Sequence, residues 1–174
     1  MIKSTFPPDG LLYRNAVIDD LPRIVEIYNS IVAGRMVTAD TEPVTVESRI
    51  RWFEEHDEHR RPLWMVYDGE ENIGWVSYQW FYGRPAYNGT AELSIYIDEQ
   101  YRGRGYGSRI LDHAIDSSAT LQIKTLLGYI FAHNVPSIKL FHKKGFETWG
   151  HFPRVAELDG VERDLLILGK RVND

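Results

Sequence analysis

The sequence predicts an α+β fold in which helices flank a mixed β-sheet. Two observations lead to this fold class. In the first half of the chain, two apolar strand patterns flank the polar turn at 68–72, and strands joined in this way pair antiparallel. The second half alternates strand and helix patterns, and strand–helix–strand units bring strands together in parallel. A sheet that contains both kinds of pairing is mixed.

Length and composition predict a single domain, residues 1–174. Of the 174 residues, 43% are hydrophobic and 26% are charged, which is the balance of a globular domain that can bury a core. Neither an internal repeat nor a linker divides the chain. Residues 1–10, which hold two prolines and a glycine without periodicity, are expected to be a short leader.

The elements of the N-terminal half follow from apolar spacing and from start and stop signals. A helix is predicted to begin after Asp19 and Asp20, with Pro22 in its first turn, and to end at Gly34. Its apolar residues recur at helical spacing: Leu21, Ile24, Val25, Tyr28, Ile31 and Val32. The other elements expected here are a strand at 11–17, a loop at 35–44, a helix at 46–56 and strands at 63–67 and 73–81.

The C-terminal half is expected to begin with an aromatic and basic loop at 82–89. After it come a strand at 90–97, a helix from 105 or 106 to 118, a strand at 125–131, a helix at 136–144 and closing strands at 146–151 and 164–168. Gly145 supplies the stop signal of the second of these helices.

Composition also excludes several classes of function. The chain has no cysteine, so disulfides, thiolate nucleophiles and cysteine-bound metals are excluded. A net charge of -5 offers no basic footprint for nucleic acid. The six histidines show no metal-ligand spacing, so no metal is expected. Without a signal-peptide pattern or an apolar run of the ~20 residues that a membrane span needs, a cytoplasmic location is expected, with no membrane partner.

The most informative motif is the glycine loop at 102–108, between a predicted strand and a predicted helix. Gly103, Gly105 and Gly107 let the backbone turn tightly and approach a ligand closely. Free N–H groups and the positive end of the helix dipole favour an anion there. Arg102 and Arg104 add positive charge, so a diphosphate is the expected guest.

The glycine loop has three other interpretations. A flexible turn with a glycine-rich helix cap remains the simplest alternative. A P-loop ends in Gly-Lys-Ser/Thr, which is absent. A dinucleotide fingerprint needs a glycine where Ser108 stands, and it normally follows the first strand of a domain.

These residues resemble the acetyl-CoA motif of the GNAT acetyltransferases, Arg/Gln-x-x-Gly-x-Gly/Ala. The later segments also resemble that superfamily, in particular Asn134, Ser137 and the run 141–146, Phe-His-Lys-Lys-Gly-Phe. Its phosphinothricin acetyltransferase-like branch is similar at further positions: Tyr28-Asn29, Thr41-Glu42-Pro43, Trp52-Phe53, Tyr87 and the strand at 90–97. The resemblance implies the GNAT fold, a mixed twisted sheet flanked by helices, and a homodimer.

The resemblance also implies how acetyl-CoA would bind, as a co-substrate. The backbone of Ile95, Tyr96 and Ile97 would pair with the pantetheine arm like an added strand. The pyrophosphate would lie on Arg102, Gly103, Arg104, Gly105, Tyr106, Gly107 and Ser108. Asn134, followed by Ser137, would contact the arm, and an N–H near Ser94 and Ile95 would bind the thioester oxygen.

The reaction implied by the resemblance needs a base, because a free amine is largely protonated at neutral pH. Glu92 is the candidate, and in the resembling branch a Glu at this motif position is the proposed base. Strands disfavour Glu, and its neighbours Leu93 and Ile95 look buried, which also favours a function. The alternative is a Glu on the solvent face of a strand.

The acceptor implied by this branch is the α-amino group of a small amino acid or analogue, of the phosphinothricin or methionine sulfoximine/sulfone type. Arg84 is a candidate clamp for its carboxylate, because guanidinium matches that group bidentately; an exposed loop arginine is the alternative. Tyr87 is a candidate to line the amine pocket, with an ordinary core aromatic as the alternative, and Glu42 is a candidate to help bind the ammonium group.

The sequence departs from the family at one position. Phe141 stands where many GNAT enzymes carry a Tyr general acid, and phenylalanine cannot donate a proton. His142 points about 100° away on a helix, so it does not substitute. We therefore assign no general acid, since a thiol with a pKa of about 8.5 leaves readily as thiolate.

Two alternatives to this function stay open at this stage. In the first alternative, the acceptor is a polyamine, an aminoglycoside or a protein N-terminus. Arg84 argues against a strongly cationic acceptor. The second is a non-catalytic acetyl-CoA-binding module, to which Phe141 gives some support.

Overall fold

The computed structural model describes residues 9–174, so most of the expected leader at 1–10 lies outside the described residues. Seven strands form one sheet in the order β1-β2-β3-β4-β5-β7-β6. The strands are β1 Leu12–Asn15, β2 Leu63–Asp68, β3 Glu71–Trp80, β4 Thr90–Ile97, β5 Thr125–Phe131, β6 Glu147–Leu158 and β7 Val161–Arg171. Among the strands of residues 9–174, only β4 and β5 pair in parallel, so the predicted mixed sheet is confirmed.

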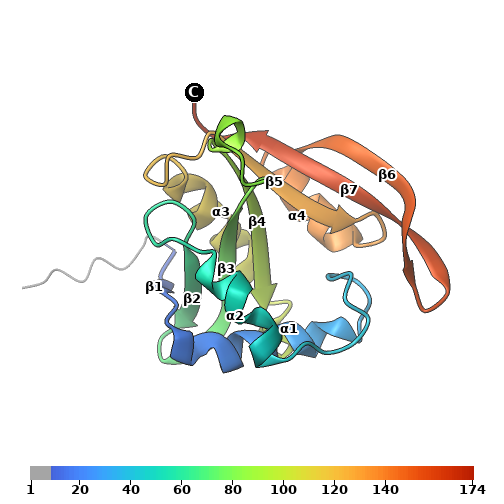
Figure 1. The fold of residues 1–174 in the computed structure, drawn as a ribbon, viewed down its shortest axis with the longest axis horizontal. Coiled ribbons are helices and arrows are strands. Elements are labelled where there is room, and N and C mark those ends of the chain that lie inside the picture. The colour runs from blue at the N-terminus through green and yellow to red at the C-terminus, as the bar shows by residue number, and fades with distance from the viewer. Residues whose placement is uncertain (1–8) are drawn as a thin grey trace, which may run out of the picture.

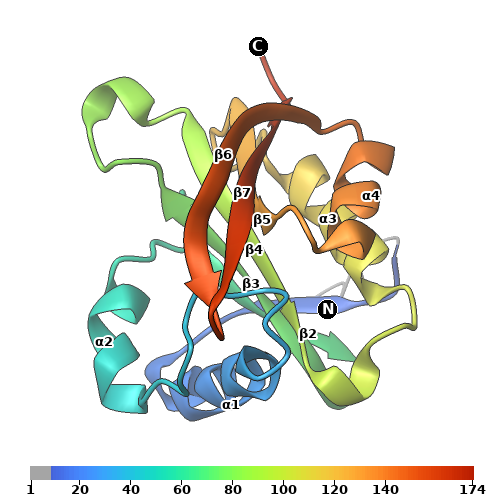
Figure 2. The same ribbon diagram turned by 90° about the vertical axis from the view of Figure 1, so that its right-hand side faces the viewer.

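Four α-helices cover the two faces of this sheet: α1 Leu21–Val32, α2 Val46–Glu54, α3 Tyr106–Ser117 and α4 Val135–Lys143. Figures 1 and 2 show α1 and α2 on one face and α3 and α4 on the other. The side chains of β3 alternate between these layers, because successive strand residues point to opposite faces. Trp75 packs with α1, whereas Val76 and Tyr78 belong to the core under α3.

The helices begin where the sequence supplies capping groups. Thr45 accepts a hydrogen bond from the Ser48 N–H at 3.2 Å and starts α2. In the same way, Asn134 accepts from the Ser137 N–H at 3.4 Å and starts α4. Gly105, with φ 81°, turns the chain into α3. No helix within residues 9–174 is both long and apolar enough to cross a membrane.

β4 and β5 separate along their length. They pair only at Thr90 with Thr125, Ala91 with Leu126 and Glu92 with Leu127. Beyond Glu92, β4 continues to Ile97 against β3, and β5 continues to Phe131 against β7. The sheet therefore opens between these strands, next to the start of α3.

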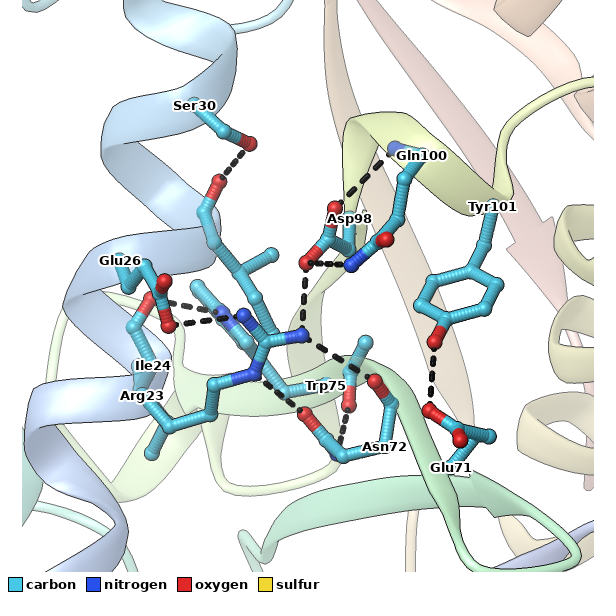
Figure 3. A network of polar contacts seen from close by, with 12 residues as sticks. Arg23, Ile24, Glu26, Ser30, Glu71, Asn72, Trp75, Asp98, Gln100 and Tyr101 are labelled. Atoms are coloured by element: carbon cyan, nitrogen blue, oxygen red, sulfur yellow. Dashed lines mark hydrogen bonds and ion pairs between the residues drawn. The ribbon is translucent and has the colours of Figure 1, made fainter.

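The end of β4 is fixed to α1 by a polar network (Figure 3). Arg23 donates to the Asp98 carboxylate at 2.6 Å and to the Asn72 side chain at 3.1 Å. Asp98 also accepts from the Gln100 N–H at 3.1 Å. Burial raises the pKa of Asp98, but the hydrogen bonds from Gln100 and Arg23 outweigh it and hold that pKa below its ordinary value. This network sets the direction in which the chain enters the glycine loop.

The closing hairpin is longer than the sequence analysis predicts. Strands expected at 146–151 and 164–168 extend to a tight turn at Asp159 and Gly160, whose φ angles of 52° and 76° suit a two-residue hairpin turn. The register shifts between Phe152 and Ala156, and this irregularity contains Pro153. Pro153 interrupts the alternating pattern, which is why the strand seemed to end early. As Figure 2 shows, the hairpin runs past the open side of the sheet.

Candidate active site

A groove lies between the separated strands β4 and β5, and we call it the glycine-loop groove. Nine of the residues proposed to bind acetyl-CoA line it: Ile95, Ile97, Arg102, Gly103, Gly105, Tyr106, Gly107, Asn134 and Ser137. Arg104 and Ser108 are not part of this lining, and the Tyr96 side chain points to a different cavity. The fold thus brings residues from β4, the loop, α3 and α4 into one groove.

The three glycines of the loop serve different purposes. Gly103 and Gly105 have positive φ angles of 75° and 81°, and a Cβ on either would meet no atom within 4 Å. They therefore shape the turn and leave open space beside the backbone. A Cβ on Gly107 would lie 3.4 Å from the Leu140 side chain, which places this glycine at the contact between α3 and α4. Tyr106 anchors the helix start by donating to Asp68 at 2.6 Å.

Asn134 connects the groove to the segment that follows α1. Its Oδ1 caps α4, and its Nδ2 donates to the Met36 carbonyl at 3.2 Å. The His133 ring lies 2.8 Å from the Arg35 carbonyl, beside this contact. Met36 and Val37 consequently line the groove across from the glycine loop.

A second hollow, the Glu92 cavity, lies on the α1–α2 face of the sheet and has a volume of about 250 Å³. Its lining comes from α1, α2, β3, β4 and Val44: Ile24, Val25, Tyr28, Val44, Arg49, Trp52, Trp75, Ser77, Gln79, Glu92, Ser94 and Tyr96. Ser94 and Tyr96 also border a smaller hollow shared with Asn134 and Phe141. The glycine-loop groove and the Glu92 cavity therefore approach each other across β4.

Glu92 has the properties of a base in this cavity. It is half-buried, and its carboxylate has no hydrogen-bond partner within residues 9–174. Burial raises the pKa of Glu92 above its ordinary value, because a buried carboxylate loses hydration. It lies directly opposite Gln79 of β3. A carboxylate held in this way can accept a proton from a bound cation.

Arg49 is the guanidinium of the Glu92 cavity, and the sequence analysis did not single it out. It lies 2.7 Å from the Asp40 carboxylate and 5.0 Å from the centre of the Tyr28 ring. The Tyr28 hydroxyl donates to Asp40 and contacts Thr38. Burial raises the pKa of Tyr28 to about 12, so the hydroxyl stays protonated. Only a packed structure reveals that this arginine of α2 faces the same space as Glu92.

The three residues proposed from the loops to bind the acceptor lie outside the lining of this cavity. Arg84 is exposed at the start of the short helical turn Pro85–Tyr87. Tyr87 packs at 5.4 Å and 5.7 Å, between ring centres, against Phe81 and Tyr82. Glu42 is exposed in the segment between α1 and α2. The fold brings none of them to Glu92 in this structure.

Phe141 and His142 lie as their positions on a helix predict. Phe141 is buried, borders the groove and packs against Phe146, with ring centres 4.8 Å apart. The His142 ring turns away and lies 2.9 Å from the Phe146 carbonyl. Neither side chain offers a proton to the groove.

Comparison with known proteins agrees with this arrangement. The model of the acetyltransferase (GNAT) family matches residues 24–146. The chain is 54% identical over 88% of its length to YwnH of Bacillus subtilis (strain 168), which is provisionally named a phosphinothricin acetyltransferase, and covers 94% of it. It is 30% identical over 89% of its length to an L-methionine sulfoximine/L-methionine sulfone acetyltransferase of Pseudomonas paraeruginosa (strain DSM 24068 / PA7), and covers 91% of that protein.

A solved structure gives the cofactor context. The GNAT superfamily phosphinothricin acetyltransferase of Sinorhizobium meliloti, in complex with AcCoA, superposes with a TM-score of 0.86 at 25% identity. The match covers 94% of this chain and 89% of that one. Acetyl-CoA is thus the co-substrate, and no cluster of residues within 9–174 has the composition of a metal site. With a family match over most of its length and the expected groove in place, the chain belongs to the GNAT family and is an acetyl-CoA-dependent N-acetyltransferase.

Proposed function

We propose that this enzyme acetylates the α-amino group of a small amino acid or analogue of the phosphinothricin or methionine sulfoximine/sulfone type. The names of the relatives support this acceptor class. The observation that carries the proposal is the pairing of opposite charges in one small cavity, with Glu92 and Arg49 both in its lining. A zwitterionic amino acid presents the complementary pair of charges.

Each part of such an acceptor has a partner in the Glu92 cavity. The ammonium group binds near Glu92, and the carboxylate accepts hydrogen bonds from Arg49, a role that we assign to Arg49 in place of Arg84. The side chain of the acceptor packs on the rings of Trp52 and Trp75, whose centres are 5.5 Å apart. A polyamine, which carries several positive charges and no carboxylate, would leave Arg49 facing a like charge.

The proposed mechanism is direct attack in a ternary complex. Acetyl-CoA occupies the glycine-loop groove, with its pyrophosphate on the N–H groups of the loop and its thioester beside Ser94 and Ile95. Glu92 accepts a proton from the ammonium group, and the free amine attacks the thioester carbonyl carbon from the Glu92 cavity. The thiol leaves as thiolate, so a donor at Phe141 is not needed.

The proposal includes a cytoplasmic homodimer. The absence of cysteine suits a reducing compartment. β6 is the edge strand of the sheet, and its hairpin exposes four large apolar side chains: Trp149, Phe152, Val155 and Val161. An exposed apolar edge of this kind favours association with a second copy.

The test is thiol release from acetyl-CoA across a panel of amines, with wild type and Glu92→Gln side by side. The panel holds methionine sulfoximine, methionine sulfone, phosphinothricin, ordinary amino acids, spermidine and an N-terminal peptide. We expect turnover of the amino-acid analogues and a loss of about 10²-fold or more in kcat for Glu92→Gln, with acetyl-CoA still bound. Glu147→Gln, on the exposed β6, serves as the control.

Other outcomes would redirect the assignment. Turnover confined to spermidine or the peptide would overturn the acceptor class and keep the enzyme class. Unchanged kcat in Glu92→Gln would overturn the role of Glu92. Tight acetyl-CoA binding without turnover of any amine would favour a non-catalytic module.

A further inference from the structure

Ser77, a buried polar side chain in the wall of the Glu92 cavity, is paired with the half-buried His56 behind it. Ser77 is fully buried, and its Oγ lies 2.7 Å from Nε2 of His56. In the β3–β4 register, Gln79 lies opposite Glu92 and Ser77 lies opposite Ser94. Ser77 is thus the diagonal neighbour of Glu92 on the same face, and such positions are about 7 Å apart. A nitrogen between them can form hydrogen bonds of about 3 Å to both.

The contacts of His56 fix the position of its proton. His56 follows the end of α2, and its Nδ1 lies 2.9 Å from the Trp52 carbonyl and 3.3 Å from the Phe53 carbonyl. Carbonyl oxygens only accept, so Nδ1 carries the hydrogen. Burial lowers the pKa of His56, which keeps the ring neutral at pH 7. Nε2 is therefore a free base that accepts the Ser77 O–H, and the lone pairs of Ser77 remain for a ligand in the cavity.

The Ser77–His56 pair crosses from the Glu92 cavity to a second one, the His56 cavity. Ser77 lines the Glu92 cavity, whereas His56 lines the His56 cavity. The other residues of the His56 cavity are Glu55, Tyr78, Gln79, Trp80, Tyr82, Gly83 and Asn88. Among the residues that line this cavity, Glu55 carries a charge, and its charge favours the imidazolium form of His56. The lining residues from β3 and from the segment that follows β3 are neutral.

The reaction offers a role for such a proton acceptor because two protons leave the nitrogen. An ammonium group has three N–H bonds and the amide product has one. One proton must leave before the lone pair can attack, and another must leave when the N–C bond has formed. Glu92 holds one proton at a time, and Phe141, which borders the groove, cannot accept one. The second proton goes either to the departing thiolate or to a separate acceptor, and the Ser77–His56 pair lies beside the Glu92 cavity as such an acceptor.

We propose that Ser77 and His56 form a relay that removes this second proton and delivers it to the His56 cavity. In the tetrahedral adduct, an N–H bond breaks as Ser77 Oγ takes the proton, and the Ser77 O–H proton passes to His56 Nε2. The C–S bond breaks with its electron pair on sulfur, and the thiolate is protonated by water. Glu92 and His56 each return one proton to water, so one proton is released per amide formed. The relay rests on the proposed amine acetylation but not on the acceptor's carboxylate.

The test compares kcat and its pH dependence in wild type, His56→Gln, Ser77→Ala and the double variant. Gln can keep a hydrogen bond to Ser77 but cannot take up a proton. We expect each single variant to lose about 10²-fold in kcat with the acceptor KM unchanged, and the double variant to lose no more than either, because the residues act as a unit. Below both pKa values, log kcat should fall with a slope of about 2 against pH in wild type and about 1 in His56→Gln. The exposed His59→Gln is the control.

A second measurement reads the relay without turnover. Nitrogen NMR of the histidines at pH 7 should show His56 as the neutral tautomer with hydrogen on Nδ1. Protonation at Nε2, or wild-type kcat in a variant that binds acetyl-CoA, would overturn the relay. If His56→Gln does not fold, Ser77→Ala and the NMR result decide. If wild type turns over no α-amino acid, the proposed acceptor is overturned instead. The kcat of the His56 and Ser77 variants would then be measured with whichever amine reacts.

Discussion

Gly128 of β5 lies against the ring of Phe141: a Cβ on this glycine would stand 2.8 Å from Cε1 of Phe141. Real Cβ atoms do not approach a ring carbon so closely, and both residues border the same small hollow beside the groove. The absence of a side chain on Gly128 therefore leaves the space that the Phe141 ring occupies at the edge of the glycine-loop groove.

Gly128→Ala is expected to push the Phe141 ring toward the groove and to weaken acetyl-CoA binding. Overpacking a filled site typically costs about 1–3 kcal/mol, which corresponds to a rise of about 5- to 150-fold in Kd. Calorimetric titration with acetyl-CoA measures it. Gly150→Ala, where the nearest atom would lie at an ordinary 3.6 Å, is the control. Adding Phe141→Leu should restore binding, and failure of that rescue would contradict the steric explanation.

Glu92→Gln is expected to stabilise the folded protein at neutral pH while it lowers kcat. The folded-state pKa of Glu92 is raised, so the folded protein binds this proton more tightly than the unfolded chain. The ionised carboxylate therefore destabilises the fold as pH rises through the raised pKa, and this penalty is absent below the unfolded pKa. Thermal unfolding of both proteins at acid and neutral pH should show a gain in Tm only at the higher pH. An equal gain in Tm at both pH values would contradict a raised pKa of Glu92 as the cause.

The sequence predicts well those features whose signals are local. The strands at 90–97 and 125–131 form with the predicted bounds, and the glycine loop begins a helix as expected. Arg49, Ser77 and His56 were missed because their importance depends on which helix packs on which strand. Arg49 and Glu92 line the same cavity although 43 positions of sequence separate them, and no local pattern links them. Arg84 was chosen for its loop, and the fold places that loop elsewhere.

Arg49→Met is expected to raise the KM of amino-acid acceptors about 10- to 100-fold, because a charged hydrogen bond contributes about 1.5–3 kcal/mol. The same acceptors with the carboxylate converted to an amide should react with wild type and Arg49→Met alike. Arg51→Met is the matched control, since Arg51 lies two residues along α2 with its side chain 92% exposed. Steady-state kinetics with both acceptor forms checks this. An equal loss for acids and amides would show that Arg49 only supports Tyr28 and Asp40.

Asp98→Asn is expected to destabilise the fold by about 1–3 kcal/mol at pH 7, because it removes the buried carboxylate that pairs with Arg23 and leaves Arg23 with the exposed Glu26. The folded-state pKa of Asp98 is depressed, so its contribution is present above the unfolded pKa and is lost as pH falls through the folded one. Urea unfolding should therefore separate wild type and variant at pH 7 and bring them together at acid pH. Asp112→Asn removes an exposed pair with Lys144 and should change stability far less.

Val155→Glu is expected to convert the proposed dimer to a monomer. Val155 is 57% exposed on the edge strand β6, and a stable interface of about 1,200–2,000 Å² in total would have to cover it and its apolar neighbours. A charge buried at such an interface without a partner is strongly unfavourable, whereas in a monomer it stays hydrated. Sedimentation analysis of wild type and variant gives the mass directly. Val17→Glu, which is equally exposed at 54% but lies near β1 at the opposite edge of the sheet, should leave the mass unchanged. A monomeric wild type would show that the hairpin is not a dimer interface, and the exposed apolar side chains of β6 would then need another explanation.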